Sequence, residues 1–558
     1  MGTTQKELLL LQIGPVQDFI AAARTTEDFW SGSYMIAYLA AAGIRHVKAA
    51  AGIRHVKEEC GGKIIFPFLD NQKIYQRLLR GEGELGQPTL PNRFLAEVPH
   101  EMARKIAVGA AAAIRQELEK ISSACFAEFC KLFPKSGARY EARWNDQVNR
   151  FLQITWQTIP LTSSTWGKDY GRLLANLAAR RNTRDFEQIL NDGEQNEFCK
   201  DALNGKDEIV GDVEEWKTVC RSPNDFFGKE DRPYGAMSII KRMWCRTCLG
   251  SKLRKKTVWD LRNPKGEAEN YIAAIQMDGD HMGQILSSKG KDGEFFTRFS
   301  RLLANFTSGK AEEIVKQHGG ELIYAGGDDV LALVPAWRAV DCALALQKQF
   351  SSDDPDMPGS EKNLAEGVSR VTLSAGIAFC HYKTPLTWLL EEARRAEHRA
   401  KEGYGRNALA LSIVKRSGET LLWGAKFDSK AWELYRRFVE LSRREILTGR
   451  FTHALAGILA EYRLEELPKE LPPKLRDALS DIIRTDFDVV CTRQKAKGKE
   501  KDEGEELKGF IELAQAYIGE LCGKDDTGKS GEKDKLSLAE FPKLFLSADF
   551  LIRKGEGK

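Results

Sequence analysis

Apolar and polar positions follow two different spacings along the chain, and together they predict a protein of mixed α and β structure. Near the N-terminus the apolar run LLLLQI at residues 8–13 leads into the turn pair Gly14-Pro15. A long segment with apolar residues at helical spacing follows, and then a second apolar run, KIIFPFL, at residues 63–69. The opening of the chain is therefore predicted to be a strand, a long helix and a strand.

The rest of the chain divides by pattern into a helical part, a β-rich part and a second helical part. From about residue 101 to about residue 260, Ala, Leu, Glu and Arg are abundant and the spacing predicts mainly helices. Residues 270–415 alternate strands with helices near 293–317, 337–350 and 386–401, an order that predicts one antiparallel sheet backed by helices on one face. After about residue 420 the pattern is again helical, with charged, Gly-rich loops.

We therefore expect an α+β multidomain chain, since 558 residues are too many for one core. The pattern predicts four regions. These are residues 1–100, which can recruit part of 101–260, and then residues 101–265, 266–418 and 419–558.

Composition limits the class of protein and its location. Hydrophobic residues make up 42% of the chain and charged residues 29%, which is typical of a globular protein. No segment reaches the about 18 consecutive apolar residues of a membrane span, and the N-terminus lacks the pattern of a secretion signal. The 11 cysteines are odd in number and irregular in spacing, so we expect reduced thiols and a cytoplasmic location.

The net charge of +4 is too small to identify a nucleic-acid partner. Two local basic clusters, AARRNTR at 178–184 and SKLRKK at 251–256, could supply a binding surface. A solvated surface is the simpler interpretation of each cluster.

Paired carboxylates are the main candidate chemistry. The stretch IYAGGDDVLALVP at 323–335 predicts a hairpin with Gly326, Gly327, Asp328 and Asp329 at its tip. Gly and Asp are ordinary turn residues, but two adjacent carboxylates repel each other and are typically held by a divalent cation. The strand YIAAIQM ends in Asp278, Gly279 and Asp280, so if the two strands are neighbours, Asp278 and Asp328 converge on one ion.

Hard oxygen ligands favour Mg²⁺, and a pair of such ions is a standard device for nucleotidyl transfer. The amphipathic helix at 386–401 delivers Lys401 and, after a Gly-Tyr-Gly break, Arg406. These basic groups are candidates for phosphate contacts, although lysines at helix ends are also common because of the helix dipole.

The ordered motifs MDGD, YAGGDDV, SAGIA and AEHRAKEGYGRN resemble the catalytic palm domain shared by GGDEF-type diguanylate cyclases and the large subunit of type III CRISPR effectors. Asp-Asp-Val after the two glycines favours the CRISPR branch. The opening LQIGPVQDFIAAARTTEDFWSGSYMIAYL and RPYGAMSIIKR at 232–242 are similar to the large subunit of the type III-B complex, the Cmr complex. Aligning LLLLQIGPVQDFI with IAAIQMDGDHMGQI places Gly14 and Pro15 near Asp278 and Gly279, so the first copy lacks the carboxylates.

This resemblance implies two ferredoxin-like palm domains, the second catalytic, with a helical and zinc-binding insert between them and a C-terminal helical bundle. It implies target-RNA-activated synthesis of cyclic oligoadenylate from ATP, alongside guide RNA (crRNA) and other Cmr subunits and with no membrane partner. Asp278, Asp328, Asp329 and the backbone of Gly279 would hold Mg²⁺ or Mn²⁺, with the three aspartates catalytic. The nucleotide would contact a second set of residues: Gly326, Gly327, Asp280, Lys401 and Arg406.

The resemblance also implies a zinc module at the C-x-x-C pair Cys245 and Cys248. A closed zinc site needs four ligands, and Cys220 is the next candidate, so a reduced thiol pair stays open as the alternative. Many members carry an HD nuclease domain, but no His-Asp dipeptide occurs among the eight histidines here, so we expect no DNase activity.

Three alternatives to oligoadenylate synthesis remain. The same site could transfer AMP to S-adenosylmethionine, or the chain could be a nucleotide-binding scaffold without catalysis. A free-standing diguanylate cyclase is the third, although its Glu-Phe motif ending and sensory regions do not occur here.

Overall fold

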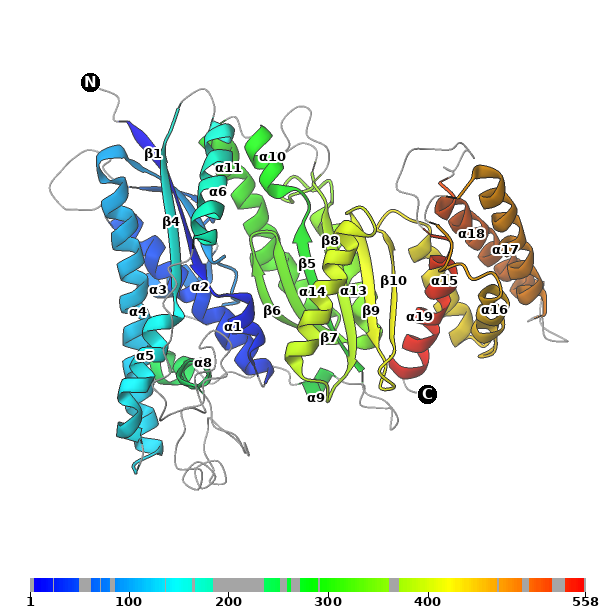
Figure 1. Cartoon of the computed structure of the whole chain (residues 1–558), viewed down its shortest axis with the longest axis horizontal. Helices are drawn as coiled ribbons and strands as arrows, with labels where there is room; N and C mark the ends of the chain where they lie inside the picture. Colours follow the sequence, from blue (N-terminus) through cyan, green and yellow to red (C-terminus); the bar gives the residue numbers. More distant parts are fainter. Residues whose placement is uncertain are drawn as a thin grey trace.

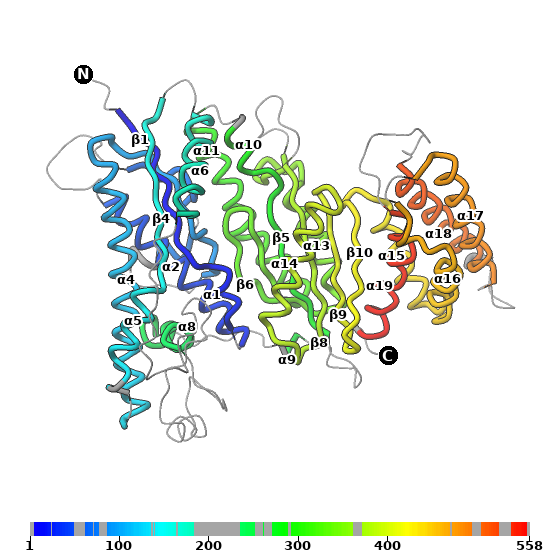
Figure 2. The backbone as a smooth tube through the Cα atoms, viewed as in Figure 1, coloured from blue at the N-terminus to red at the C-terminus, as the bar shows by residue number. Residues whose placement is uncertain are grey.

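The structure is a computed structural model in which an N-terminal sheet, a central sheet and a group of C-terminal helices follow one another along the long axis (Figure 1, Figure 2). It describes residues 5–23, 25–49, 62–70, 72–80, 86–135, 137–162, 166–183, 235–250, 258–261, 271–289, 292–360, 371–468, 471–493, 501–523 and 537–555.

The N-terminal sheet has four strands in the order β2-β3-β1-β4, and every neighbouring pair is antiparallel. The strands are β1 (Lys6–Gly14), β2 (Lys63–Phe66), β3 (Arg93–Pro99) and β4 (Gln153–Pro160). Helices α2 (Thr26–Ala49) and α4 (Ala103–Leu132) connect β1 to β2 and β3 to β4, which gives the βαββαβ order of a ferredoxin-like unit. The short helix α3 (Lys73–Arg80) lies between β2 and β3.

Strand β4 lies in the stretch for which the sequence predicts helices, and for these residues the prediction was wrong. The strand is at the edge of the sheet and most of its side chains are only half-buried, so it lacks the clear apolar run of β1. It follows helix α5 (Glu141–Phe151) and precedes helix α6 (Trp166–Asn182).

The apolar run of β1 is continuous because both faces of this strand are covered. Leu9, Leu11 and Ile13 belong to the core that includes α2, α4 and α8 (Ala236–Leu249). Leu8 and Leu10 belong to a second core with α6 and α11 (Gly293–Asn305). A strand buried on both faces needs apolar residues at every position rather than at alternate ones.

The central sheet has six strands in the order β10-β9-β8-β5-β7-β6. They are β5 (Tyr271–Gly279), β6 (Glu321–Gly326), β7 (Asp329–Pro335), β8 (Leu373–His381), β9 (Ala408–Val414) and β10 (Thr420–Lys426). Its first four strands repeat the N-terminal topology, since β8-β5-β7-β6 corresponds to β4-β1-β3-β2. Helices α10 (Met282–Lys289), α11 and α12 (Ala311–Gln317) connect β5 to β6, and α13 (Ala339–Phe350) connects β7 to β8.

Two details of this sheet differ from the sequence-based prediction. Strands β8 and β9 are parallel, because helix α14 (Leu386–Glu402) crosses over between them, so the sheet is mixed rather than antiparallel. Helices also cover both faces. α11, α12 and α13 contribute to the core on one face, and α14 and the short helices α1 (Gln17–Ala21) and α9 (Val258–Leu261) to the core on the other.

The C-terminal helices share one continuous core with the central sheet. They are α15 (Ala431–Arg443), α16 (Phe451–Ala460), α17 (Pro473–Arg493), α18 (Lys501–Leu521) and α19 (Glu540–Gly555). The prediction of helices after residue 420 is right except at β10, which pairs with β9 as the edge strand. The boundary expected at residue 418 therefore falls in the turn of the β9–β10 hairpin.

The described residues thus confirm the α+β class. No helix among them is both long enough and apolar enough to cross a membrane.

Candidate functional site

The two carboxylate groups of the sequence meet at one end of the central sheet. Strand β5 lies directly beside β7, with Met277 opposite Val330, and the same register places Asp278 opposite Asp329. Gly327 and Asp328 form the turn between β6 and β7. The expectation that these two strands are neighbours is confirmed, and Asp278, Asp328 and Asp329 come together.

Glycines allow this close approach. A Cβ atom on Gly279 would lie 2.8 Å from the Cβ of Asp328, so only glycine lets the end of β5 contact the hairpin tip. Gly327 has a φ of +69°, in the left-handed region that favours glycine, and a Cβ there would lie 3.3 Å from Phe66. Both positions are therefore set by geometry as well as by turn propensity.

The electrostatics of the three carboxylates are unfavourable as they stand. Burial, and then the charge of Asp278, raises the pKa of Asp328 to about 6. Burial and the charges of Asp278 and Asp328 raise the pKa of Asp329 well above its ordinary value. Such a cluster needs a positive charge to remain ionised at neutral pH.

Lys401 supplies one positive charge. It lies in the last turn of α14, and its Nζ donates to Asp278 and also contacts Glu397 at 2.6 Å. Burial lowers the pKa of Lys401, but the Asp278 and Glu397 carboxylates outweigh it and raise that pKa above its ordinary value. Helix α14 comes close enough to do this because it packs on Gly376 of β8, where a Cβ would overlap the helix backbone.

The donor chemistry of this cluster fits a divalent cation. Asp278, Asp328 and Asp329 supply hard oxygen donors at one point. Burial and mutual repulsion raise the pKa values of Asp328 and Asp329, and Lys401 is drawn onto Asp278. Within the described ranges, no group of three or more His, Cys, Asp or Glu side chains is already arranged to hold a metal ion. Binding of an ion at Asp278, Asp328 and Asp329 would therefore include displacement of Lys401 from Asp278.

Asp280 has a different environment from the other three aspartates. It is only 3% exposed, and its carboxylate accepts hydrogen bonds from the hydroxyls of Thr372 (2.8 Å) and Ser374 (2.7 Å) and from the backbone N–H of Asn407 (2.9 Å). The sequence suggested a nucleotide contact for Asp280. The structure gives its carboxylate three internal partners that join β5, β8 and the loop after α14.

Arg406 lies in that same loop, with its guanidinium 3.3 Å from Glu402. It is not among the residues that line the cleft beside the aspartates. A phosphate contact by Arg406 remains a prediction that these contacts do not support.

A cleft of about 1110 Å³ opens beside the hairpin tip, between the two sheets. Gly326, Gly327, Asp328 and Asp329 line it from the central sheet. The N-terminal half lines it with the end of β1, the segment after it, and β3 and β4. Basic side chains surround it, namely Arg93, Arg115, Arg180, Arg181 and Arg394.

Of these basic residues, Arg93 acts most directly on the carboxylates. It begins β3 of the N-terminal sheet, and its charge lowers the pKa of Asp328 against the effect of burial. The sequence analysis missed Arg93, because nothing local distinguishes it from any other arginine at the start of a strand. It did single out the cluster that contains Arg180 and Arg181, which the structure places at the cleft, whereas residues 251–256 lie outside the described residues.

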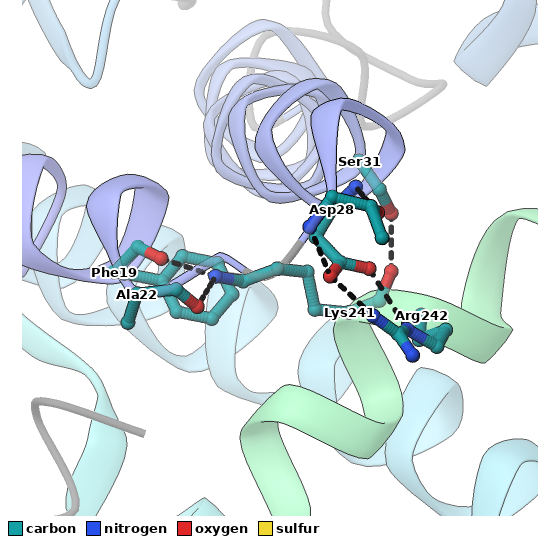
Figure 3. Close-up of polar contacts among 7 residues, drawn as sticks. Phe19, Ala22, Asp28, Ser31, Lys241 and Arg242 are labelled. Atoms are coloured by element: carbon teal, nitrogen blue, oxygen red, sulfur yellow. Dashed lines mark hydrogen bonds and ion pairs between the residues drawn. The ribbon is translucent and has the colours of Figure 1, made fainter. Parts of the chain in front are cut away.

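Helix α1 forms part of the cleft wall and is held by hydrogen bonds from α8 and from α14. Figure 3 shows the bonds from α8. The buried Nζ of Lys241, in α8, donates to the backbone carbonyls of Phe19 and, at 2.9 Å, Ala22. Thr387 of α14 donates to the carbonyl of Ala21 at 3.2 Å. These bonds satisfy carbonyls that a helix end leaves without intrahelical partners.

The residue beside Lys241 attaches α8 to α2. Arg242 donates two hydrogen bonds to the carboxylate of Asp28, at 3.0 and 2.6 Å (Figure 3). The stem of Lys241 passes over Gly32 of α2, where a Cβ would lie 3.1 Å from its Cε. The motif RPYGAMSIIKR thus supplies the two basic side chains, Lys241 and Arg242, that connect α8 to α1 and α2.

The cysteine pair has a partner that the sequence did not indicate. Cys125 of α4 lies beside Cys248, and the interaction of the two thiols raises the pKa of Cys125 and lowers that of Cys248. Cys245 lies 3.6 Å from the Oγ of Ser31. Cys220 lies outside the described residues, and none of the described cysteines forms a disulfide. A zinc ion at Cys245 and Cys248 remains a prediction.

Two sequence models of protein families match the chain, and both fall on the parts described above. "Cas10/Cmr2, second palm domain" matches residues 271–410, which contain the carboxylate site. "CRISPR-associated protein Cmr2, N-terminal" matches residues 8–123 of the N-terminal sheet region.

Individual proteins and solved structures of CRISPR effector subunits are also similar to this chain. The "CRISPR system Cmr subunit Cmr2" of Pyrococcus furiosus is 24% identical over 655 residues, covering 90% of this chain and 70% of that protein. Among solved structures, the apo type III-B Cmr-beta complex contains a chain with a TM-score of 0.63 and 12% identity, covering 99% of this chain and 82% of that one. A chain of the Csm1–Csm4 cassette with cA4 gives a TM-score of 0.50 and 13% identity, covering 98% and 70%. At these identities the structural likeness establishes the fold.

Proposed function

The chain belongs to the Cas10/Cmr2 family, and from this premise we propose that it synthesises cyclic oligoadenylate from ATP as the large subunit of a type III-B CRISPR effector. One observation supports the proposal above all. Three carboxylates converge at the mouth of a cleft that is lined with arginines and large enough for nucleotides. As part of the same proposal, the N-terminal sheet is a second palm domain that lacks the carboxylates.

In the proposed reaction a ribose hydroxyl of one ATP attacks the α-phosphorus of another. The new phosphorus–oxygen bond forms as the bond between the α- and β-phosphates breaks, pyrophosphate leaves and the hydroxyl proton passes to solvent. Mg²⁺ or Mn²⁺, when bound by Asp278, Asp328 and Asp329, lowers the pKa of the attacking hydroxyl and neutralises charge on the triphosphate.

The protein's own residues bind and orient the reactants. Asp328 and Asp329 concentrate negative charge in the cleft, with Asp278 directly behind them on β5, and Gly326 and Gly327 let a triphosphate approach the backbone without side chains in the way. Lys401, released from Asp278, and Arg93 on the opposite wall supply positive charge to phosphates. The reactants are thus held between two sheets rather than on one.

The cost of the carboxylate cluster favours catalysis over a purely structural role. Burial and mutual repulsion raise the pKa values of Asp328 and Asp329, an arrangement that destabilises the fold and has no structural benefit among the described contacts. Such perturbed groups beside a cleft are typical of functional sites. A scaffold subunit would not need them.

Partners follow from the family and from one solved relative. The type III-B Cmr-beta complex bound to cognate target RNA contains a chain that matches 99% of this one, with a TM-score of 0.60. We propose that this chain likewise assembles with crRNA, target RNA and other Cmr subunits, and that pairing with target RNA activates synthesis in the cytoplasm.

Product identification tests the proposal. The chain, assembled with crRNA, partner subunits and matching target RNA, is incubated with ATP, S-adenosylmethionine and Mg²⁺, and the products are analysed by mass spectrometry. We expect cyclic oligoadenylates that are absent when Asp328→Ala/Asp329→Ala replaces the wild-type chain. If the product is a conjugate of AMP with S-adenosylmethionine, the acceptor is S-adenosylmethionine and not ATP. If an assembled complex makes no nucleotide product, catalysis is refuted.

A further inference from the structure

The loop that follows α14 has an unusual backbone. Gly405, Arg406 and Asn407 have φ angles of +73°, +63° and +45°, so three successive residues adopt the left-handed region. Two of the three are not glycine, and side chains adopt this region only at a cost in free energy. The side-chain Oδ1 of Asn407 is also buried and finds no hydrogen-bond partner among the described residues. A loop of this kind persists only where its surroundings hold it.

One side of the loop is held by the catalytic end of the sheet. The backbone N–H of Asn407 donates to Asp280, and the carbonyl of Asn407 accepts from the N–H of Phe427 at 2.8 Å. Asp280 lies two residues after Asp278, and Lys401, which donates to Asp278, lies two residues before Gly403. The loop is therefore attached at both ends to the groups around the carboxylate cluster.

The other side is held by the C-terminal helices. The Tyr404 side chain is 5% exposed, and its hydroxyl donates to the carboxylate of Glu540 at 2.8 Å. Glu540 begins α19 and is largely buried, and burial raises its pKa. Gly424 of β10 makes room for the ring, since a Cβ there would lie 2.7 Å from a Tyr404 ring carbon. One partly buried hydrogen bond thus joins residues 136 positions apart.

We infer that Tyr404 and Glu540 are positioning residues, whose hydrogen bond lets helix α19 hold the loop 403–407 in the conformation that keeps Asp280 and Lys401 beside Asp278. Without this bond the loop has one restraint fewer against its backbone strain, and it relaxes toward ordinary φ values. Asn407 then leaves Asp280, and the end of α14 with Lys401 shifts relative to the carboxylates. The position of the C-terminal helices is in this way coupled to the catalytic site.

Three variants and a matched control test this inference in the assembled complex with crRNA and target RNA. Tyr404→Phe removes the donor, Glu540→Ala removes the acceptor, and Glu540→Gln keeps an acceptor oxygen. The control is Tyr462→Phe, which removes a hydroxyl that donates to Asp486 at 2.5 Å within the C-terminal helices, far from the loop in sequence. Each of the four substitutions changes one partner of a hydrogen bond between a tyrosine hydroxyl and a carboxylate.

The first readout is steady-state kinetics of nucleotide product formation, which rests on the proposed function. We expect Tyr404→Phe and Glu540→Ala to lower kcat by about 10-fold with little change in the KM for ATP, as is typical of residues that orient metal-site groups. Glu540→Gln should recover most of the rate, and Tyr462→Phe should match the wild type. Equal effects of Tyr404→Phe and Tyr462→Phe, or no effect of either, would overturn the inference.

The second readout does not depend on activity. Amide hydrogen exchange of the full chain, followed by mass spectrometry of peptides that cover residues 403–408, reports whether the Asn407 amide remains bonded to Asp280. We expect faster exchange in Tyr404→Phe and Glu540→Ala but not in Tyr462→Phe. If the wild type makes no nucleotide product, the proposed function fails while this exchange still decides the positioning role, and unchanged exchange in Tyr404→Phe refutes it.

Discussion

The environment of each acid separates the three clustered aspartates, which we propose to be catalytic, from the structural Asp280. Asp278, Asp328 and Asp329 lie together with little compensating charge, whereas Asp280 accepts three hydrogen bonds inside the protein. The first group is held against its own repulsion, and the last one stabilises the fold. The same residue type, within a few positions of the sequence, therefore has opposite effects on stability.

Replacing one acid of the cluster should stabilise the protein. Because the pKa of Asp328 is raised to about 6, it is charged and buried at pH 7.5, and Asp328→Asn removes that charge. We expect the melting temperature, measured by scanning fluorimetry without divalent ions, to rise by about 2–4 °C, the shift that 1 kcal/mol produces in a domain of 150–250 residues. Asp280→Asn is the matched comparison and should lower it, because an amide cannot accept all three bonds. A fall for Asp328→Asn would contradict the repulsion argument.

Lys241 should give the protein a recognisable pH dependence. Burial lowers the pKa of Lys241 to about 7, whereas the unfolded chain retains a value near 10.5. Between these values the unfolded state binds more protons, so this group makes the folded state more stable as pH rises from 7 to about 10.5. The stability of Lys241→Met relative to the wild type, measured as the free energy of unfolding, should therefore be greatest at pH 7. This advantage should disappear by pH 10.

Thermal unfolding of both proteins across this pH range checks the direction of this pH dependence. Differences between variant and wild type cancel the titration of other lysines, tyrosines and cysteines. Parallel curves with a constant separation would mean that Lys241 keeps an ordinary pKa.

Sequence reasoning located the acids well but not their partners. Asp278, Asp328 and Asp329 follow apolar strands and occupy turn positions, so local pattern is enough to place them at strand ends. Arg93, Cys125 and Glu540 reach their partners by packing between distant segments, and no local spacing marks them. Asp280 looked like its neighbours in sequence, and only its internal hydrogen bonds distinguish it.

At the scale of the elements, the site depends on how closely the end of β5 approaches the β6–β7 hairpin. Gly279 permits that approach, since any Cβ there meets both Asp328 and Met282. Helix α14 packs on Gly376 and so brings Lys401 to the third side of the carboxylate cluster. The positions of the carboxylates are therefore a property of three elements and of the small residues between them.

Gly279→Ala tests this dependence. The added methyl group forces β5 and the hairpin tip apart, and we expect product formation to fall by about 10- to 100-fold, as misplacement of reacting groups typically causes. Gly283→Ala in α10 is the control, because a Cβ there would lie 3.9 Å from Leu174 in ordinary contact. Product formation by the two variants, at equal assembly into the complex, checks the prediction. Wild-type activity in Gly279→Ala would show that the approach is not needed.

Two strands that the sequence analysis placed in helical regions lie at sheet edges, although two other edge strands, β2 and β6, were recognised. Strands β4 and β10 are edge strands, and both were assigned to helical regions from their surroundings. Strands β5 and β8, which are buried on both sides, were recognised from their apolar runs. The parallel pairing of β8 with β9 follows from the crossover of α14, which residue spacing does not encode.

For the molecule as a whole, the repeated βαββαβ topology places two sheets around one cleft. The central sheet contributes Asp328 and Asp329, and the N-terminal half contributes Arg93 of β3 and further arginines on α4 and α6, so neither half lines the cleft by itself. The N-terminal sheet has a core on each of its two faces.

Arg93 tests the contribution of the N-terminal sheet. Arg93→Met removes a cation from the cleft wall, so we expect weaker binding of the triphosphate, seen as a KM for ATP raised by about 10-fold. The loss of its charge should also raise the pKa of Asp328 further. Arg150→Met is a suitable control, because Arg150 forms an exposed ion pair with Asp146 on α5 and such pairs contribute little. An unchanged KM in Arg93→Met would restrict the site to the central sheet.

The measurement that tests the central claim most directly is the rate of pyrophosphate release from ATP by the assembled, target-RNA-bound complex containing Asp329→Asn. Because the substitution removes a carboxylate from the cluster and leaves the shape of the side chain nearly unchanged, we predict a loss of at least about 100-fold relative to wild type. Asp341→Asn, at an acid exposed on α13, should release pyrophosphate at the wild-type rate. Equal rates from wild type and Asp329→Asn would contradict a catalytic role for the three carboxylates.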